Sequence, residues 1–262
     1  IMDYNHLLAG KNVFISSGQR GIGKEIALLF AEQGATIALG GPKEKLLEKT
    51  IQEIRQFSPA SKGYQVDLSD AQQTEKTCEC VLQDFGFIDI LVNTVGLNRH
   101  MPIHLCEDEL LEYLLETNYK SGFRCVRKFV PSMMERNSGN IINISSIHAV
   151  MTMPGFGVYA GTKGAMNATA RAMALDYAPY GIRVNNICPG LILSDNMMDE
   201  INSYPEGKER EDFMTLLRNM QPMAPGTMPA ISNAALYLAS EMSAYTTGQT
   251  LMIDGGASIK AH

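Results

Sequence analysis

The chain has few cysteines, no long apolar run and no excess of positive charge. Its five cysteines in 262 residues form no pair of Cys-x-x-Cys units, so we expect no zinc or other metal site. Unpaired thiols are typical of a reducing compartment, which favours a cytoplasmic protein. No stretch approaches the roughly 20 apolar residues of a membrane helix, so no membrane partner is expected. Lys and Arg number 22 against 28 Asp and Glu, which leaves no basic footprint for nucleic acid.

What the chain does have is an alternation of apolar runs and amphipathic segments. Near-continuous apolar strands separated by helices indicate a parallel sheet covered on both faces. With 45% hydrophobic residues and no linker or repeat, the sequence predicts one α/β domain over residues 2–262, a Rossmann-like doubly wound parallel sheet flanked by helices on both faces. The predicted strands are Val13–Ser16, Thr36–Leu39, Gly63–Val66, Ile88–Val92, Asn140–Ile144, Arg183–Ile187 and Leu251–Ile253. The predicted helices are Ile22–Gln33, Lys43–Phe57, Asp70–Phe85, Glu107–Arg136, Val158–Ala178 and Ser232–Leu238.

Residues 191–229 interrupt this alternation. The segment holds six methionines and four prolines, and the sequence predicts it to be irregular. An insertion of this length in a compact domain is often a lid or a binding loop. We expect a substrate lid here.

A glycine-rich turn, SSGQRGIG at positions 16–23, joins the first predicted strand to the first predicted helix. Glycines let the backbone approach a phosphate closely, and the free N–H groups of a helix N-terminus attract anions. In this context the pattern indicates a dinucleotide pyrophosphate site. The residues expected to contact the cofactor here are Ser17, Gln19, Arg20, Gly21 and Ile22.

A Tyr-x-x-x-Lys pair, Tyr159 and Lys163, lies in the predicted helix Val158–Ala178. The spacing of four places both side chains on one face of the helix. A phenol with a pKa near ~10 is a weak base at neutral pH, and a neighbouring ammonium favours its phenolate. The pair therefore suits Tyr159 to transfer a proton.

Together these motifs resemble the short-chain dehydrogenase/reductase family over nearly the whole chain. The turn is similar to the family's TGxxxGIG, with Ser17 at the first glycine. VDL at 66–68, NTVG at 93–96 and CPGLILS at 188–194 resemble further family segments, with Ser194 in place of a threonine. The resemblance implies the catalytic residues Asn118, Ser146, Tyr159 and Lys163. It implies further cofactor contacts from Asp67, Leu68, Asn93, Gly96, Tyr159, Lys163, Pro189, Ile192 and Ser194.

The end of the second predicted strand bears on the choice of cofactor. A carboxylate there usually binds the ribose 2′-hydroxyl of NAD, whereas Gly41 occupies that position here. Arg20 and Lys43 could reach a 2′-phosphate instead. We therefore expect NADP(H) as the preferred cofactor, with NAD(H) as the alternative.

The resemblance implies a small-molecule secondary alcohol or its ketone as the substrate, and the sequence leaves the class of substrate open. The residues expected to line its pocket are Ser146, His148, Tyr159, Gly190 and Met197. A polar His148 favours a sugar or polyol, and a methionine-rich lid favours a bulky apolar alcohol such as a hydroxysteroid. A 3-oxoacyl thioester is the alternative, although 222–225 lacks the arginine often found in that subgroup.

Two further expectations concern the role and the assembly of the chain. A dinucleotide-binding sensor or scaffold without turnover is the alternative from another class, and the intact Asn118, Ser146, Tyr159 and Lys163 set argues against it. The family implies a homo-oligomer, a tetramer or else a dimer. Small residues on one face of the helix after Tyr159 could pack against a partner helix.

Overall fold

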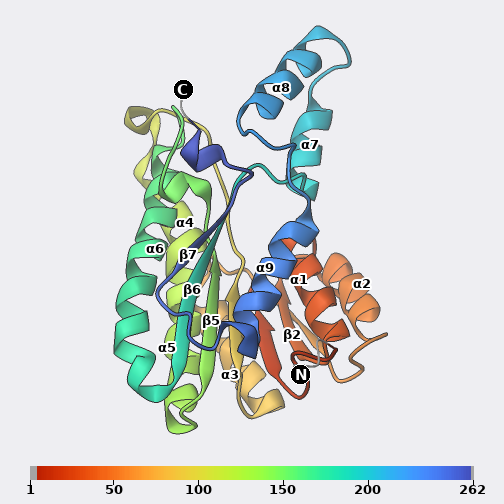
Figure 1. The fold of residues 1–262 in the computed structure, drawn as a ribbon, viewed down its shortest axis with the longest axis vertical. Helices are drawn as coiled ribbons and strands as arrows, with labels where there is room; N and C mark the ends of the chain where they lie inside the picture. The colour runs from red at the N-terminus through yellow and green to blue at the C-terminus, as the bar shows by residue number, and fades with distance from the viewer. Residues whose placement is uncertain (1–4, 261–262) are drawn as a thin grey trace.

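A seven-stranded parallel sheet forms the centre of the protein, whose computed structural model describes residues 5–260 (Figure 1). The strand order is β3-β2-β1-β4-β5-β6-β7, and every neighbouring pair is parallel. This confirms the predicted doubly wound sheet. The strands are β1 (Asn12–Ile15), β2 (Thr36–Gly41), β3 (Lys62–Gln65), β4 (Ile90–Asn93), β5 (Gly139–Ile144), β6 (Ile182–Pro189) and β7 (Thr250–Ile253).

Helices cover both faces of the sheet (Figure 1). Helices α1, α2 and α9 pack on one face, and α3, α5 and α6 pack on the other, as the two separate core clusters show. The helices are α1 (Gly21–Glu32), α2 (Glu44–Ile54), α3 (Ala71–Phe85), α4 (Asp108–Leu115), α5 (Ser121–Glu135), α6 (Gly157–Tyr177), α7 (Asp195–Ser203), α8 (Lys208–Asn219) and α9 (Met228–Ala239).

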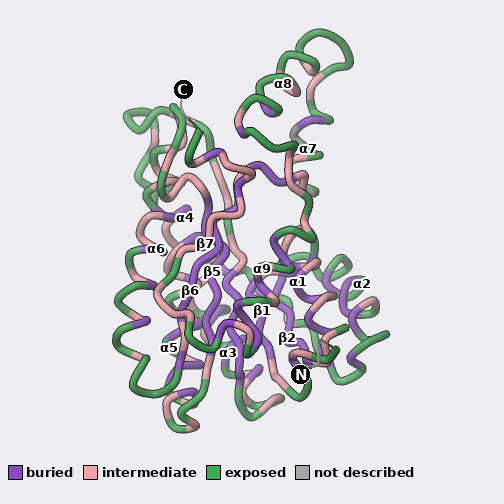
Figure 2. The backbone as a smooth tube through the Cα atoms, viewed as in Figure 1, coloured by how far each residue is buried: buried purple, intermediate pink, exposed green. Residues whose placement is uncertain are grey.

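Both faces of the sheet are covered, and its central strands are buried (Figure 2). Successive side chains of a strand point to opposite faces. In β1, Val13 and Ile15 enter the core under α1 and α9, whereas Phe14 enters the core under α3 and α5. Two buried faces require an apolar residue at nearly every strand position, which is why these strands read as continuous apolar runs.

The strand order reverses between β1 and β4, because β2 and β3 lie on one side of β1 and β5 to β7 lie on the other side of β4. In open parallel sheets, ligands bind outside the carboxyl ends of the strands at such a switch point. The turn at 16–20 and the loop that starts at Thr94 both lie at this edge. The topology therefore fixes where a site can form.

The structure changes three of the predicted elements. The long helix predicted over 107–136 is divided into α4 and α5 by a π-helical turn, Glu116–Lys120. Helix α9 begins at Met228, four residues before the predicted Ser232, because Pro229 lies in its first turn, where a missing N–H is harmless. The segment 191–229 is not irregular, since it contains α7 and α8.

Helices α7 and α8 project beyond the carboxyl edge of the sheet (Figure 1). They have a small apolar cluster of their own, which includes Leu191, Ile201 and Leu217, with Met197 and Met214 packed against it. We refer to residues 191–229 as the lid, a role that stays a prediction. Within the described residues, 5–260, no helix is long and apolar enough to cross a bilayer.

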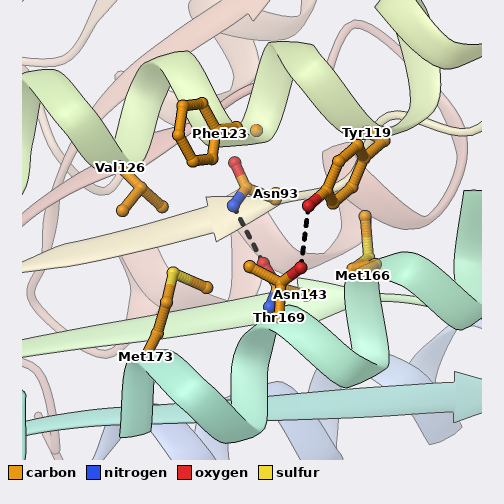
Figure 3. A pocket seen from close by; sticks show the side chains of 9 residues that line it. Asn93, Tyr119, Phe123, Val126, Asn143, Met166, Thr169 and Met173 are labelled. Carbon is orange, nitrogen blue, oxygen red and sulfur yellow. Dashed lines mark hydrogen bonds between the residues drawn. The ribbon is translucent and has the colours of Figure 1, made fainter. Parts of the chain in front are cut away.

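A ladder of amide side chains crosses the sheet beneath α5 and α6, and Figure 3 shows the part of it formed by Asn93 and Asn143. Asn93, Asn143 and Asn186 stand in register on β4, β5 and β6. The Nδ2 of Asn93 donates to Asn143 Oδ1 at 2.9 Å, and the Nδ2 of Asn143 donates to Asn186 Oδ1 at 3.0 Å. The ladder braces the carboxyl ends of the strands, and Asn93 faces the hollow between α5 and α6, together with Tyr119 and Phe123.

Candidate active site

The glycine-rich turn after β1 is fastened to the turn after β4. The Ser17 N–H donates to Thr94 Oγ1 at 2.9 Å, and that hydroxyl donates back to the Ser17 carbonyl at 2.6 Å. The Thr94 N–H donates to Ser16 Oγ at 3.0 Å. Ser17 thus takes part through its backbone, and Thr94 supplies the side chain that joins the two turns.

Two glycines of this turn are required by its shape. Gly21 has φ +64°, a left-handed conformation that favours glycine. A Cβ on Gly23 would lie 2.0 Å from the Ser17 carbonyl oxygen, so only glycine lets α1 begin this close to the turn. Such a cradle of backbone N–H groups fits the pyrophosphate of a dinucleotide.

Gln19 is buried beside the end of β2. Its Oε1 accepts from the Lys43 N–H at 2.8 Å, and its carbonyl accepts from Thr50 Oγ1 at 2.9 Å. A Cβ on Gly41 would lie 2.9 Å from Gln19 Oε1. Gln19 therefore holds the turn against β2, where the structure brings Gly41 and Lys43 together.

Asp67 and Leu68 follow β3 at the same edge of the sheet. The Oδ1 of Asp67 accepts from the N–H of Ser69 at 3.0 Å and from its hydroxyl at 2.7 Å. Leu68 is buried. Asp67 thus closes its own turn, and its side chain is exposed at the edge where an adenine is expected.

Helix α7 of the lid contacts the glycine-rich turn directly. The Gly21 N–H donates to Asp195 Oδ2 at 2.9 Å, and Arg20 Nη1 lies 3.0 Å from Asp199 Oδ2. Arg20, which was predicted to reach a 2′-phosphate, is thus paired with an acidic side chain of the lid. Sequence reasoning missed both acidic residues, although a capping Ser194 directly before Asp195 is a signal for a helix start.

Tyr159 and Lys163 lie on one face of α6, as their spacing predicts. Lys163 is only 1% exposed, and its Nζ donates to the carbonyls of Val95 and Ile144, at 3.0 Å each. Burial lowers the pKa of Lys163 to about 8. Burial also raises the pKa of Tyr159, a shift that the hydrogen bond from Ser146 opposes. A Cβ on Gly96 would lie 3.1 Å from Lys163 Nζ, so a larger residue at this position would crowd the ammonium.

Ser146 and His148 follow β5 and face the same site. The backbone N–H of His148 donates to Ser146 Oγ at 3.2 Å, which leaves the Ser146 proton for another acceptor. The His148 ring stacks on Phe156 with centroids 4.3 Å apart, and it lies edge-on to the Tyr159 ring at 5.8 Å. Burial lowers the pKa of His148 and so favours the neutral form of its ring. His100 lies edge-on to Phe156 at 5.2 Å, and neither of these two rings was predicted to contribute.

Asn118 lies in the π-helical turn between α4 and α5. Its Oδ1 accepts from the Leu97 N–H at 2.8 Å, and its Nδ2 donates to the Leu97 carbonyl at 2.8 Å. The same Nδ2 donates to Thr162 Oγ1 on α6 at 3.2 Å. Asn118 therefore fixes the loop after β4 to the helix that carries Tyr159, and π-turns of this kind are frequent at functional sites.

The segment after β6 leads from the sheet into the lid. Pro189 ends β6, and a Cβ on Gly190 would lie 2.7 Å from the Cα of Asp254. Ile192 is buried, and Ser194 caps α7 by accepting from the Met197 N–H at 3.4 Å. Met197 packs within the lid cluster. The hydroxyl of Ser194 thus has a structural bond in addition to its expected cofactor contact.

The structure brings Ser146, Tyr159 and Lys163 together behind the glycine-rich turn at the switch point of the sheet. A family model described as enoyl-(acyl carrier protein) reductase matches residues 17–258. The chain is a short-chain dehydrogenase/reductase. It is 33% identical to a 3-oxoacyl-[acyl-carrier-protein] reductase of Staphylococcus aureus over 249 residues, 94% of this chain and 97% of that relative. A reductase of the same name from Thermotoga maritima is 32% identical, with 95% and 98% covered.

Solved structures of this family have the same fold. A protein described as a short-chain dehydrogenase/reductase of Burkholderia xenovorans superposes with a TM-score of 0.91 at 26% identity, over 98% of this chain and 99% of that chain. ElxO with NADP bound superposes with a TM-score of 0.85 at 27% identity, over 95% and 99%. As a short-chain dehydrogenase/reductase, the protein is an oxidoreductase.

Proposed function

We propose that the protein interconverts a secondary alcohol and a ketone with NADP(H), using Tyr159 as its acid and base. The observation that carries the proposal is the buried Lys163 on the same helix face as Tyr159, beside the Ser146 hydroxyl. A protein that only bound a dinucleotide would not need the hydroxyls of Ser146 and Tyr159 beside this ammonium, which is itself expensive to desolvate. This argues against the sensor or scaffold.

Each side chain of the site has a separate task in the proposed reaction. When bound, the cofactor would supply or accept the hydride at the carbonyl carbon. The Ser146 hydroxyl donates to the substrate oxygen and stabilises negative charge on it, as an oxyanion donor does. Tyr159 gives its proton to that oxygen in reduction and takes it back in oxidation.

Lys163 supports Tyr159 in this scheme. An ammonium has three donors, and the carbonyls of Val95 and Ile144 use two of them. The third is left for the ribose of the cofactor. The positive charge favours the phenolate of Tyr159 and so offsets part of the effect of its burial.

The preference for NADP(H) rests on the end of β2. Gly41 carries no carboxylate that would repel a 2′-phosphate, and Lys43 starts the segment that leads into α2. Arg20 lies on the neighbouring turn. The NADP bound to ElxO supports the same choice.

The rings beside Tyr159 favour a substrate with apolar parts. The row of rings from His100 through Phe156 and His148 leads to Tyr159 and forms an aromatic wall. A hydroxysteroid-like alcohol would lie against such a wall, whereas His148 could still bond a hydroxyl of a sugar or polyol. The second candidate is the reduction of a 3-oxoacyl thioester, which the names of the Staphylococcus aureus and Thermotoga maritima relatives favour.

A substrate screen tests this proposal. Purified protein would be assayed with NADPH and NADH separately against hydroxysteroids, 3-oxoacyl thioesters, sugars, polyols and small hydroxy acids, with absorbance of the reduced nicotinamide as the readout. We expect a ketone that is reduced faster with NADPH. Cofactor binding without turnover on any of these substrates would instead support the sensor.

We propose in addition that the chain forms a homo-oligomer, a tetramer or else a dimer. Ala168 and Ala172 are exposed on α6, and Leu175 is 79% exposed beyond them, so this face can receive a partner helix. Light scattering after size-exclusion chromatography would give the mass, and a monomer would overturn the proposal.

A further inference from the structure

Two carboxylates on one face of α7 hold the lid against the glycine-rich turn. Asp195 Oδ2 accepts from the Gly21 N–H at 2.9 Å, and Asp199 Oδ2 lies 3.0 Å from Arg20 Nη1. The two acidic residues are four positions apart, so they lie one above the other on the helix. Their partners are 174 and 179 positions away in the chain, and these contacts therefore fix how the lid sits on the body.

Asp195 accepts its hydrogen bond at the N-terminus of α1. Gly21 is the first residue of α1, and its N–H has no acceptor within its own helix. The N-terminus of a helix carries partial positive charge and attracts anions. Asp195 thus places a carboxylate where the proposed function requires the pyrophosphate of the cofactor.

The position of Asp199 has a different consequence. Arg20 is one of the cations expected to recognise the 2′-phosphate that distinguishes NADPH from NADH. Its pairing with Asp199 is largely exposed, with 42% and 66% of the two side chains accessible, so the pair is weak and can exchange. A 2′-phosphate would have to replace Asp199 to gain Arg20.

We propose that Asp195 and Asp199 set the affinity and the selectivity for the cofactor by competing with its phosphates. Asp195 competes with the pyrophosphate, which both nicotinamide cofactors carry. Asp199 competes with the 2′-phosphate, which only NADPH carries. Cofactor binding then replaces the contacts that Asp195 and Asp199 make with the turn. This inference rests on the proposed function.

The proposal predicts different effects for the two residues. A comparison of NADPH binding with NADH binding separates these effects. Asp195→Asn keeps the shape of the side chain and the Ser194 cap but removes the charge, and it should tighten NADPH and NADH alike, by about tenfold, as expected for a hydrogen bond to a charged group. Asp199→Asn should tighten NADPH by about threefold and leave NADH unchanged, because the exposed ion pair contributes little. Asp212→Asn, an exposed acidic residue of α8, removes the same charge from the lid away from the turn and should change neither.

The measurement is the dissociation constant of each cofactor, by fluorescence titration at low ionic strength without substrate. Weaker or unchanged binding in Asp195→Asn would overturn the competition and mean that the carboxylate instead organises the turn. Equal tightening of both cofactors in Asp199→Asn would overturn its role in selectivity. A wild-type protein that binds neither cofactor would contradict the proposed function itself, which is a different failure.

Hydrogen exchange at the Gly21 amide gives an independent readout in the free protein. We expect faster exchange in Asp195→Asn than in the wild type, and slow exchange in both after NADPH is added. Equal exchange in the two free proteins would mean that Asp195 does not occupy this N–H in solution, and the inference would fall.

Discussion

The Nζ of Lys163 lies 5.8 Å from the centre of the Tyr159 ring, one helical turn along the same face of α6. The hydrogen bonds of Nζ among the described residues go to the carbonyls of Val95 and Ile144, so the ammonium acts on the phenol through its charge. Burial works against both groups, since it lowers the pKa of Lys163 and raises the pKa of Tyr159. In the proposed reaction, a bound, positively charged nicotinamide would favour the phenolate of Tyr159 and so oppose the effect of its burial.

Replacing Tyr159 with Phe removes the hydroxyl that we propose as the proton donor and keeps the ring. We expect turnover to fall by about 100- to 10,000-fold, the usual contribution of a positioned acid or base, while the dissociation constant for NADPH changes little. Steady-state rates and a fluorescence titration would check the two parts. Tyr177→Phe, at the end of the same helix, is the matched control and should keep full turnover. Equal rates in Tyr159→Phe and the wild type would refute the assigned role.

Lys163 makes stability depend on pH in a predictable direction. Below pH 8 it is protonated in both the folded and the unfolded state, and burying the ammonium destabilises the fold. Between its folded pKa of about 8 and its ordinary value of 10.5, the folded protein gives up a proton that the unfolded chain keeps. The unfolded state then binds more protons, so the free energy of unfolding rises with pH through this window.

A comparison with Lys163→Met isolates this effect. The free energy of unfolding of the wild type should increase relative to that of the variant by about 2.5 kcal/mol between pH 7 and pH 10. Urea unfolding of both proteins at several pH values, without cofactor, measures it. Groups that titrate in both proteins cancel in the difference. A difference that stays constant with pH would show that Lys163 keeps its ordinary pKa.

Asn118 is expected to act as a positioning residue. Asn118→Asp keeps the acceptor for the Leu97 N–H but loses both donor bonds, to the Leu97 carbonyl and to Thr162 Oγ1. The lost bonds and the buried charge should lower the free energy of unfolding by about 1–3 kcal/mol. Because the loop after β4 is then held less firmly to α6, kcat should fall more than the affinity for NADPH. Thermal melts and kinetics would test this, and unchanged values for both would contradict it.

The sequence predicts the sheet well because central strands such as β1 and β4 are continuous apolar runs between helix patterns. Val13 to Ile15 are buried on alternate faces, so no polar residue interrupts the pattern, and helix α3 starts directly after the predicted cap, Asp70. The Tyr159 and Lys163 pair is equally local, since a spacing of four in a helix fixes its geometry. These features depend on neighbours in the chain.

The lid shows what local patterns miss. Its prolines were read as a sign of irregular structure, but Pro205 lies between α7 and α8, and Pro229 lies in the first turn of α9. The contact between Asp195 and Gly21 joins residues 174 positions apart, and no periodicity encodes it. The π-helical turn at Asn118 depends likewise on bonds to Leu97, 21 positions away.

The close contact of Gly23 with Ser17 gives a prediction for the cofactor site. In Gly23→Ala the new methyl group would meet the Ser17 carbonyl oxygen at 2.0 Å and the Gly18 Cα at 3.0 Å, and both are backbone atoms that can only move together with the turn. We expect a loss of about 1–3 kcal/mol in stability, as for other overpacked sites, and at least a tenfold weaker binding of NADPH. Gly161→Ala is the matched control, because its Cβ would enter open space on α6. Thermal melts and NADPH titrations of the two variants should differ clearly, and a Gly23→Ala protein that binds NADPH like the control would show that the turn does not form the cofactor cradle.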